Sequence, residues 1–292
     1  MNLKAWKQKG KFIEVNGHRL FYIDTEEIEK PALLILHGYP SSSYDYHAVL
    51  SIFSKKFRVI IHDHLGFGFS DKPLNYSYSL VDQTKVILQF WEQLGLKNGH
   101  ILAHDYGTSI ATEMLARVIE GFKNIEFESV TISNGSVHIE LAQLRTIQKL
   151  LKSPVVGPLI ARLSTKKLFT HNMRNLWYDK QKINNAELDV LWELLTMNNG
   201  KNVLSQITRY IDERYKNWDR WIGAWSSTRI PTHILWAKND PVAVSAIAKA
   251  LFNDNSNARL TMLDNLGHYP MLEDPERWAN GAMEFYEGGF FG

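Results

Sequence analysis

Short apolar segments separated by helical patterns are the feature that most restricts what this chain can fold into. A type I′ hairpin signal at Asn16-Gly17 comes first, and six apolar segments suited to buried strands follow it. Helical patterns lie between these segments, and one of them begins at Ser79 with Asp82 at the capping-box position. Strands that alternate with helices predict a mostly parallel sheet covered by helices on both faces. The predicted strands are 11–16, 19–24, 32–36, 57–62, 101–103, 129–133, 230–236 and 259–263, and the helices include 79–95, 106–119, 243–252 and 275–286.

The alternation stops at Gly135, and the next part of the chain has only helical patterns. One of them is the amphipathic segment AELDVLWELLTM, for which Asn185 is the expected N-cap. We therefore expect one α/β domain formed by residues 1–136 and 219–292, with residues 137–218 inserted after the sixth strand as a helical cap. Such an insertion commonly covers a site at the carboxyl ends of the strands.

Composition excludes several kinds of chemistry. The 292 residues include no cysteine, so disulfides, thiol nucleophiles, cysteine-ligated zinc and iron–sulfur clusters are ruled out. The 33 basic and 31 acidic residues leave a net charge of +2, which gives no strong field for nucleic acid or an acidic membrane. No apolar stretch approaches the ~18 residues of a membrane span, and the N-terminus has no apolar signal core. We expect a cytoplasmic protein, provided that no leader has been removed.

The sharpest local motif is AHDYG, at residues 103–107. A predicted strand ends there, Asp105 follows at once, and a helix begins, with small residues two positions before and after the aspartate. This is the strand–turn–helix context of a nucleophile elbow, and Asp105 stands where serine hydrolases have serine. Taken alone, Asp105 could instead be a helix N-cap. Ser109 is a poorer nucleophile candidate, because it lies about one turn inside the predicted helix.

Two further polar residues follow strands in the order that this architecture predicts. Asp240 in KNDPV comes after the strand 230–236, and His268 in LGHYP comes after the strand 259–263. A nucleophile, an acid and a histidine in that chain order, each beyond the carboxyl end of a strand, predict a catalytic triad. The alternatives are a turn aspartate before proline and a histidine on a surface loop. Another carboxylate could also replace Asp240 as the partner of His268.

The segment HGYP, at residues 37–40, follows the third predicted strand and fits the loop of an oxyanion hole. The backbone N–H groups of Tyr39 and Tyr106 would then be the two donors. A plain turn, signalled by glycine and proline, is the alternative.

Two other loops contain residues found in metal or dinucleotide sites, but the other features that such sites require are missing from the sequence. His62 and His64 flank an aspartate, but no further ligands at a recognisable spacing accompany them, so we expect no metal site. The glycine-containing loop at residues 66–73 lacks the strand and helix on either side that a dinucleotide site requires. We therefore expect no cofactor.

Several segments together resemble the α/β-hydrolase fold: HGYPSSSYDY, DHLGFGFSDKP, AHDYG, NDPV and GHYPMLEDP. They are similar to its branch of epoxide hydrolases and haloalkane dehalogenases, and to the mesoderm-specific transcript proteins. The resemblance spans residues 11–286, including the insertion. It implies a mostly parallel eight-stranded sheet with a helical cap after strand 6. It also implies an aspartate nucleophile at Asp105, the acid at Asp240, the histidine at His268 and an oxyanion loop at Tyr39.

The resemblance suggests residues for substrate binding as well. Epoxide hydrolases of this branch protonate the opening ring with cap tyrosines, and Tyr210 matches the second of these. No tyrosine stands where the first is expected, so either one tyrosine suffices, or Tyr178 replaces it, or the activity differs. His37 and His104, beside the oxyanion loop and the nucleophile, are further candidates for substrate binding or proton donation.

An aspartate nucleophile restricts the class of substrate. A carboxylate that is ionised at neutral pH can displace a leaving group from saturated carbon and form an alkyl ester without a general base. His268, oriented by Asp240, would then activate the water that hydrolyses this ester. Eight aromatic residues lie in or just beyond the insertion, and we expect most of them to pack in the core and the remainder to line an apolar pocket, which predicts a small hydrophobic substrate. The eight are Trp177, Tyr178, Trp192, Tyr210, Tyr215, Trp218, Trp221 and Trp225.

Epoxide hydrolysis is therefore the first hypothesis for this chain. Haloalkane dehalogenation is the alternative, weakened because the positions that bind halide in dehalogenases hold Tyr106 and Tyr39. A third hypothesis is a ligand-binding protein that has kept the fold without turnover. The expected partners are a hydrophobic substrate and water, without nucleic acid, and the chain is expected to be a monomer or a homodimer.

Overall fold

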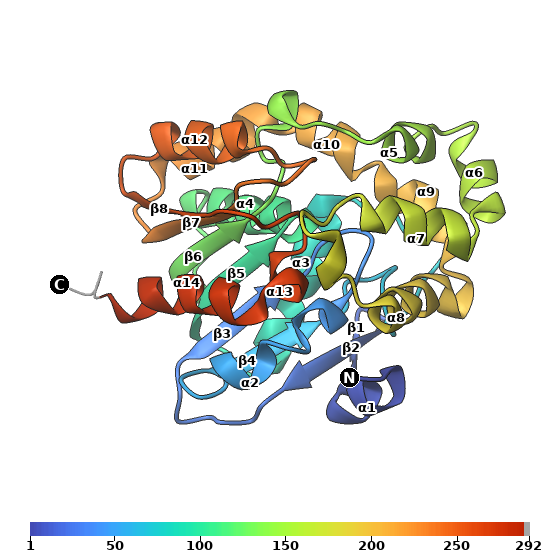
Figure 1. Ribbon diagram of the computed structural model, residues 1–292. Helices are drawn as coiled ribbons and strands as arrows, with labels where there is room; N and C mark the ends of the chain where they lie inside the picture. Colours follow the sequence, from blue (N-terminus) through green and yellow to red (C-terminus); the bar gives the residue numbers. More distant parts are fainter. Residues whose placement is uncertain (289–292) are drawn as a thin grey trace.

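The computed structural model describes residues 1–288. Its strands form one eight-stranded sheet in the spatial order β1-β2-β4-β3-β5-β6-β7-β8 (Figure 1). Strands β3 to β8 are parallel to one another, whereas β2 is antiparallel to both β1 and β4. The mostly parallel eight-stranded sheet is thus confirmed. The strands are β1 (Lys11–Val15), β2 (His18–Asp24), β3 (Ala32–Leu36), β4 (Arg58–His62), β5 (Asn98–His104), β6 (Glu126–Ser133), β7 (Thr232–Ala237) and β8 (Ala258–Leu263).

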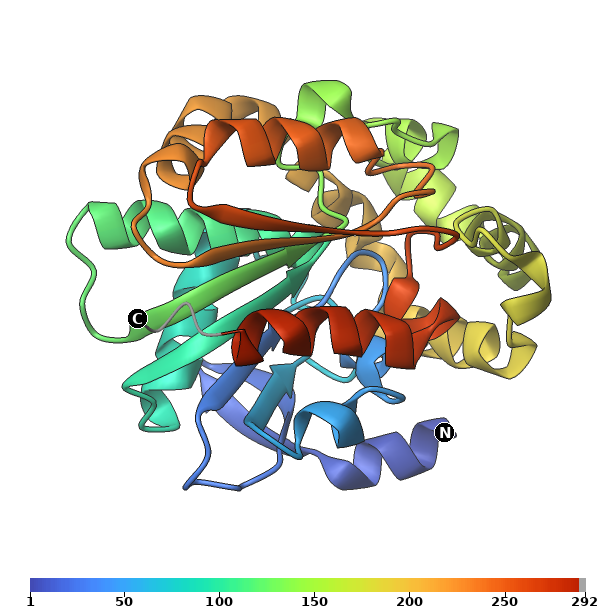
Figure 2. The same cartoon turned by 60° about the vertical axis from the view of Figure 1, so that its left-hand side comes forward.

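Helices cover both faces of the sheet, and Figures 1 and 2 show α12 and α14 on opposite sides of it. The helices outside the central insertion are α1 (Leu3–Lys9), α2 (Leu50–Phe53), α3 (Leu80–Gln93), α4 (Tyr106–Ile119), α12 (Ser245–Asp254), α13 (Pro270–Glu273) and α14 (Pro275–Glu287). Between β6 and β7 lie α5 (Thr146–Leu151), α6 (Gly157–Leu163), α7 (Lys166–Arg174), α8 (Asn185–Thr196), α9 (Lys201–Thr208), α10 (Tyr210–Lys216) and α11 (Trp218–Ser227). Short 3₁₀ turns are Ser43–Tyr46, Ile139–Leu141, Lys180–Lys182 and Met197–Asn199.

The core is divided by the sheet into two apolar clusters. In β3, Leu34 and Leu36 belong to one cluster, and Leu33 and Ile35 belong to the other. Successive side chains of a strand point to opposite faces, so a strand that is covered on both sides must be apolar throughout. This is why the central strands are continuous apolar runs and not alternating ones.

Local signals in the sequence predicted most element ends well. Asn16 and Gly17 both have positive φ in the turn between β1 and β2, and the Ser79 side chain accepts a hydrogen bond from the Asp82 N–H at the start of α3. The predicted cap at Asn185 is wrong by one residue, because it is the Asn184 side chain that accepts the Ala186 N–H. Helix α1 has no counterpart among the predicted elements. Its one buried side chain, Trp6, packs edge-on against Tyr44 and donates a hydrogen bond to Ser43 Oγ.

The segment between β6 and β7 contains no strand among the described residues. Helix α11 packs against α4 and α12, so it lies on the sheet, whereas α5 packs against α6 and α9. Figure 1 shows α5 to α9 beyond the sheet, at the edge where β3 and β5 end. That these residues form a separate cap with bounds at 137 and 218 stays a prediction. No helix within residues 1–288 is long and apolar enough to cross a bilayer.

Candidate active site

A strained turn between β5 and α4 carries Asp105. Its backbone has φ 43° and ψ −104°, a conformation that L-residues rarely adopt and that is characteristic of functional turns. Gly107 lets the turn approach β3, since a Cβ there would lie 2.4 Å from the Leu36 carbonyl oxygen. Although Asp105 precedes the helix, its side chain makes no capping hydrogen bond. The carboxylate therefore has another role than that of an N-cap.

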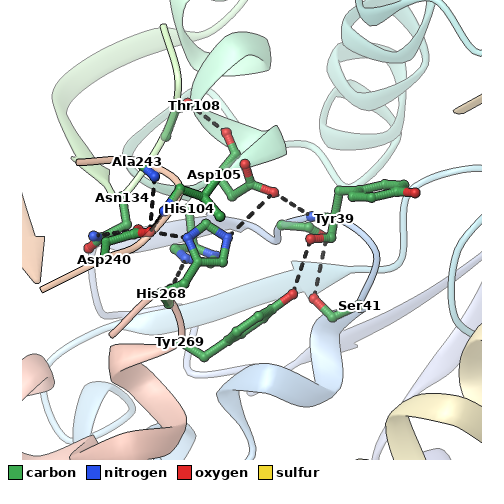
Figure 3. A network of polar contacts seen from close by, with 12 residues as sticks. Tyr39, Ser41, His104, Asp105, Thr108, Asn134, Asp240, Ala243, His268 and Tyr269 are labelled. Carbon is green, nitrogen blue, oxygen red and sulfur yellow. Dashed lines mark hydrogen bonds and ion pairs between the residues drawn. The ribbon is translucent and has the colours of Figure 1, made fainter. Parts of the chain in front are cut away.

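The structure brings Asp105, His268 and Asp240 together at the carboxyl ends of the strands (Figure 3). His268 Nδ1 lies 2.7 Å from Asp240 Oδ2, and His268 Nε2 lies 4.0 Å from Asp105 Oδ2. All three side chains are buried. Nδ1 of the imidazole is thus hydrogen-bonded to the Asp240 carboxylate, and Nε2 faces the candidate nucleophile Asp105. This is the arrangement of a hydrolase triad.

Asp240 is held in place by four hydrogen-bond donors. Oδ1 accepts the backbone N–H groups of Val242 and Ala243, and Oδ2 accepts the Asn134 amide as well as His268 Nδ1. The structure therefore shows which carboxylate is the partner of His268, a question that the sequence left open. Asn134 was not predicted; it follows β6 directly, as the other polar residues of this site follow their strands.

The charges around His268 change its protonation. Burial lowers the pKa of this imidazole, but the Asp240 carboxylate, through its charge and its hydrogen bond, and the Asp105 carboxylate more than offset that effect. The pKa of His268 is consequently raised above its ordinary value of 6.5. A histidine in this environment can take up a proton from a nearby water and hold it as an imidazolium.

The oxyanion loop lies against the same carboxylate. The Tyr39 N–H donates to Asp105 Oδ2 at 2.9 Å, and the Tyr269 hydroxyl donates to the Tyr39 carbonyl oxygen at 3.1 Å, which anchors the loop. The hydroxyl of Tyr39 points away from Asp105, as Figure 3 shows, and lies 2.7 Å from Thr208 Oγ1. Tyr106 is the first residue of α4, where backbone N–H groups have no partner inside the helix. Both predicted oxyanion donors are therefore next to Asp105.

A buried arginine beside Asp105 was missed by the sequence interpretation. The Arg214 side chain is 1% exposed, and its Nη2 donates to the Asp105 backbone carbonyl oxygen at 2.8 Å and lies 3.6 Å from Asp105 Oδ1. Nε donates to Ser109 Oγ at 2.8 Å, and the guanidinium lies over the Tyr210 ring. The only local signal is its spacing, four residues after Tyr210 on the same helix, which places both side chains on one face. The hydroxyl of Ser109, the alternative nucleophile, is therefore engaged in a hydrogen bond with Arg214.

We predict that Arg214→Gln lowers the free energy of unfolding by about 3 kcal/mol, because removing one partner leaves a buried carboxylate uncompensated. Chemical denaturation measures this loss. Arg209→Gln, at an exposed position just before α10, is the matched control and should change stability little. Equal stability of the two variants would show that the Arg214 charge does not balance Asp105.

His37 and His104 do not line the cavity described below, and neither do Asp105 and Tyr210, so substrate binding by the two histidines stays a prediction. His37 Nδ1 lies 2.8 Å from the Gly38 carbonyl oxygen, and its Nε2 accepts the His64 N–H. His104 Nε2 lies 2.8 Å from the His268 carbonyl oxygen. Burial lowers the pKa of both imidazoles to about 4, which keeps them neutral. They support the oxyanion loop and the His268 loop from behind.

The imidazole rings of His62 and His64 are hydrogen-bonded to each other, with 2.9 Å between His62 Nε2 and His64 Nδ1. Burial lowers the pKa of both, and the nearby His37 adds to that effect. Within the described part of the chain, no group of three or more histidine, aspartate or glutamate side chains is arranged to hold a metal ion.

A cavity lies between the predicted cap helices and the triad. It contains about 810 Å³ of space between atoms, including its opening to solvent, and Tyr39 and His268 form its inner end. Tyr210 adjoins this end, because its hydroxyl accepts a hydrogen bond from Gln148 Nε2 in the cavity wall. Tyr178 does not: its side chain is 48% exposed and lies outside the wall. We therefore do not retain Tyr178 as a proton donor.

Most of the cap aromatics pack and do not line this cavity. Most of the eight aromatics were expected to pack, and only Trp192 of them lies in the wall, which is otherwise mainly aliphatic. The indole N–H groups of Trp221 and Trp225 are bonded to Glu113 and to the Leu251 carbonyl oxygen, so these side chains belong to the core. The apolar character of the cavity comes from Ile147, Leu151, Leu168, Phe169, Met173, Leu176, Leu195, Leu204 and Val242.

Known proteins resemble this chain over most of its length. A family model described as "alpha/beta hydrolase fold" matches residues 31–275. The "Putative hydrolase LipZ" of Mycobacterium tuberculosis is 35% identical over 282 residues, covering 97% of each chain. The mesoderm-specific transcript protein of Mus musculus is 34% identical over 292 residues, covering 97% of this chain and 87% of its own. The resemblance stated from the motifs is thereby confirmed.

Solved structures show the same fold at much lower sequence identity. The haloalkane dehalogenase DbeA from Bradyrhizobium elkani superposes with a TM-score of 0.81 at 18% identity, covering 96% of this chain and 97% of its own. At that identity the similarity concerns the fold alone.

Proposed function

The chain belongs to the α/β-hydrolase fold family, and we propose that it is a hydrolase that uses Asp105 as nucleophile and forms a covalent alkyl ester. One observation carries this proposal: a carboxylate occupies the strained turn, with one oxygen on an oxyanion donor and an imidazole nitrogen 4.0 Å away. A serine in this position would need the histidine to remove its proton, whereas an ionised carboxylate can attack directly. We further propose that the leaving group is the oxygen of an epoxide.

The first step is attack on a ring carbon. Because Oδ2 of Asp105 already accepts the Tyr39 N–H, Oδ1 is the oxygen that forms the new bond to carbon. The bond between that carbon and the ring oxygen breaks, and the ring oxygen takes a proton from the Tyr210 hydroxyl. Gln148 donates to this hydroxyl oxygen, which leaves the hydroxyl hydrogen available to the substrate. Burial raises the pKa of Tyr210, with a contribution from the Asp105 charge, so the group stays protonated until the ring opens.

The second step hydrolyses the ester. A separation of 4.0 Å between His268 Nε2 and Asp105 Oδ2 is too long for a direct hydrogen bond, and it suits a histidine that acts through a water. His268 takes the proton of that water while its oxygen attacks the Asp105 carboxyl carbon. The oxyanion forms on Oδ2, where the N–H groups of Tyr39 and Tyr106 stabilise it. Collapse of this intermediate breaks the bond between the Asp105 carboxyl carbon and the alkyl oxygen, which takes the proton held by His268, so a diol is released. The second proton of the attacking water leaves the Asp105 carboxyl and returns the Tyr210 phenolate to its neutral form, which restores the resting site.

The cavity defines the substrate class that we propose. Its wall is mainly aliphatic, with one indole. Tyr39, Gln148 and His268 are the polar residues next to the triad and Tyr210, and the other polar residues of the wall are Arg145, Ser164 and Asn172. A site of this kind binds an apolar molecule that presents one polar reacting group to the triad. The proposed substrate is therefore a small hydrophobic epoxide.

We predict that Tyr210→Phe lowers the rate of diol formation about 10²-fold, because the ring oxygen then leaves without a proton donor. A panel of aryl and alkyl epoxides, with diol measured by chromatography, gives the rates. Tyr215→Phe is the matched control on the same helix; this side chain is exposed and its loss should leave the rate unchanged.

If the wild-type protein forms no diol from any epoxide, the epoxide part of the proposal is wrong. Release of halide from short haloalkanes by the same preparation would then assign the leaving group to halide. Unchanged diol formation in Tyr210→Phe would instead leave the substrate class standing and remove Tyr210 as the acid.

A further inference from the structure

A patch of exposed apolar side chains on α5, α6 and α7 is not explained by the proposed hydrolysis. Six of the fourteen large apolar or aromatic side chains exposed within residues 1–288 lie between positions 150 and 168. Val155 is 83% exposed, Leu159 55% and Leu163 65%. Exposed apolar side chains are normally scattered singly, so their concentration on one short segment marks an interaction surface. Figure 1 shows these helices along the outer edge of the molecule, remote from the C-terminus.

Helix α6 has its small residues inside and its large ones outside. Gly157 and Ala161, four residues apart, are its buried positions, and α6 packs against α9. A Cβ on Gly157 would lie 2.2 Å from the Leu151 carbonyl oxygen and 2.4 Å from Ser205 Oγ, so this face needs glycine. Leu159 and Leu163 are offset from that pair by two positions, which places them on the opposite side of the helix. The outward ridge is therefore a consequence of how the helix is packed.

The charge of this segment differs from that of the whole chain. Residues 141–178 contain seven lysines and arginines and no aspartate or glutamate, although the complete chain is almost balanced. Lys152 and Lys166 pair with Asp212 and Asp189 of neighbouring helices. Lys149, Arg162 and Lys167 are exposed, and nothing in the described part of the chain forms an ion pair with them. These three cations are available to an anionic partner.

We propose that this surface docks on a bilayer that contains anionic lipids. The surface, called the cap face below, consists of Leu150, Val155, Val156, Leu159, Leu163 and Leu168 with Lys149, Arg162 and Lys167. Cations beside an apolar ridge match the two parts of such an interface, since lipid phosphates attract the cations and the acyl boundary accepts leucine and valine. Nucleic acid would match the charge but would leave the ridge in water.

The cap face is continuous with the cavity. Leu168 is 43% exposed and also lies in the cavity wall, next to Phe169 and Ser164. Since no described helix can span a bilayer, the docking is interfacial, with the side chains entering only the boundary between headgroups and acyl chains. An apolar molecule dissolved in the bilayer would then have a short path to the cavity.

Co-sedimentation with vesicles tests this proposal without any assay of turnover. The full chain is mixed with vesicles of phosphatidylcholine alone or of phosphatidylcholine and phosphatidylglycerol in equal parts, at low and high salt. The test variants are the triple change Val155→Ser, Leu159→Ser, Leu163→Ser and the charge reversal Arg162→Glu with Lys167→Glu. The control variant changes three exposed apolar residues elsewhere, Ile28→Ser, Leu74→Ser and Ile119→Ser. Circular dichroism confirms that each variant is folded.

We expect the wild-type protein to bind the anionic vesicles, and its binding should fall as the salt concentration rises. Both test variants should bind at least about tenfold more weakly, whereas the control variant should bind like the wild type. Absence of binding by the wild type overturns the proposal, as does binding that both test variants retain. If the serine variant instead converts a dimer into a monomer in light scattering, without any vesicle binding by the wild type, the cap face is an interface between copies of the chain. Failure of epoxide hydrolysis would leave this test unaffected.

Discussion

Asp105→Asn is expected to lower the rate of substrate hydrolysis by at least about 10⁴-fold, because an amide oxygen cannot displace a leaving group from saturated carbon. The amide has the shape of the carboxylate and can still accept the Tyr39 N–H, so the turn between β5 and α4 should keep its conformation. Steady-state rates with the substrate found in the epoxide panel measure the loss.

Asp24→Asn is the matched control for this change. Asp24 is also a buried carboxylate, and it pairs with Arg58 far from the triad, so its loss should affect stability and not turnover. Ser109→Ala provides the opposite test, since Ser109 Oγ is bonded to Arg214 Nε and is not the proposed nucleophile. Activity that survives in Asp105→Asn and disappears in Ser109→Ala would transfer the nucleophile to the serine.

His268→Gln is expected to stop the reaction after the first step, so that the alkyl ester forms but is not hydrolysed. Asp105 can still attack, but no group then activates the water, so the alkyl ester accumulates at one equivalent per chain. Intact-protein mass spectrometry should show an adduct with the mass of the epoxide, and peptide mapping should place it on Asp105. A variant that turns over like the wild type, or an adduct found on another residue, would contradict the two-step scheme.

The hydrolysis step should also depend on pH in a defined direction. His268 accepts a proton only when it is neutral, and the pKa of this group in the resting protein is raised above 6.5. Ester hydrolysis is therefore expected to slow as the pH falls and this imidazole takes up a proton. In the intermediate, Asp105 has lost its charge, and with it one of the contributions that raise the pKa of His268. The pKa of His268 is thus lower in the ester than in the resting protein, so the imidazole stays neutral to a lower pH in the intermediate.

The sequence alone predicted the layer architecture, because the responsible signals are local. A strand buried on both faces must be apolar throughout, a helix repeats its apolar positions every three or four residues, and turns need glycine or asparagine. These patterns placed the eight strands and the interruption after β6 to within a few residues. The motif at residues 103–107 pointed to Asp105 for the same reason, since a strained turn needs small neighbours along the chain.

The partners of Asp105 could be proposed from the sequence only as candidates. Chain order suggested Asp240 and His268, yet other carboxylates stayed possible until the structure placed Asp240 Oδ2 2.7 Å from the imidazole and four donors around that carboxylate. The sequence offered Tyr178 as a possible replacement for the missing first cap tyrosine, but its side chain is exposed, whereas Tyr210 is buried next to the site. No pattern in the sequence distinguishes an aromatic that packs from one that faces a cavity.

The sequence by itself therefore determined the fold, the position of the strained aspartate and the order of the polar loops. Only the tertiary structure decided that Arg214 lies against Asp105, that Asn134 supports Asp240, and that α6 presents leucine to solvent and glycine to α9. The physical reason is distance along the chain. Periodicity and turn chemistry act between residues a few positions apart, whereas these contacts join residues about one hundred positions apart in two of the three cases and depend on how whole elements pack.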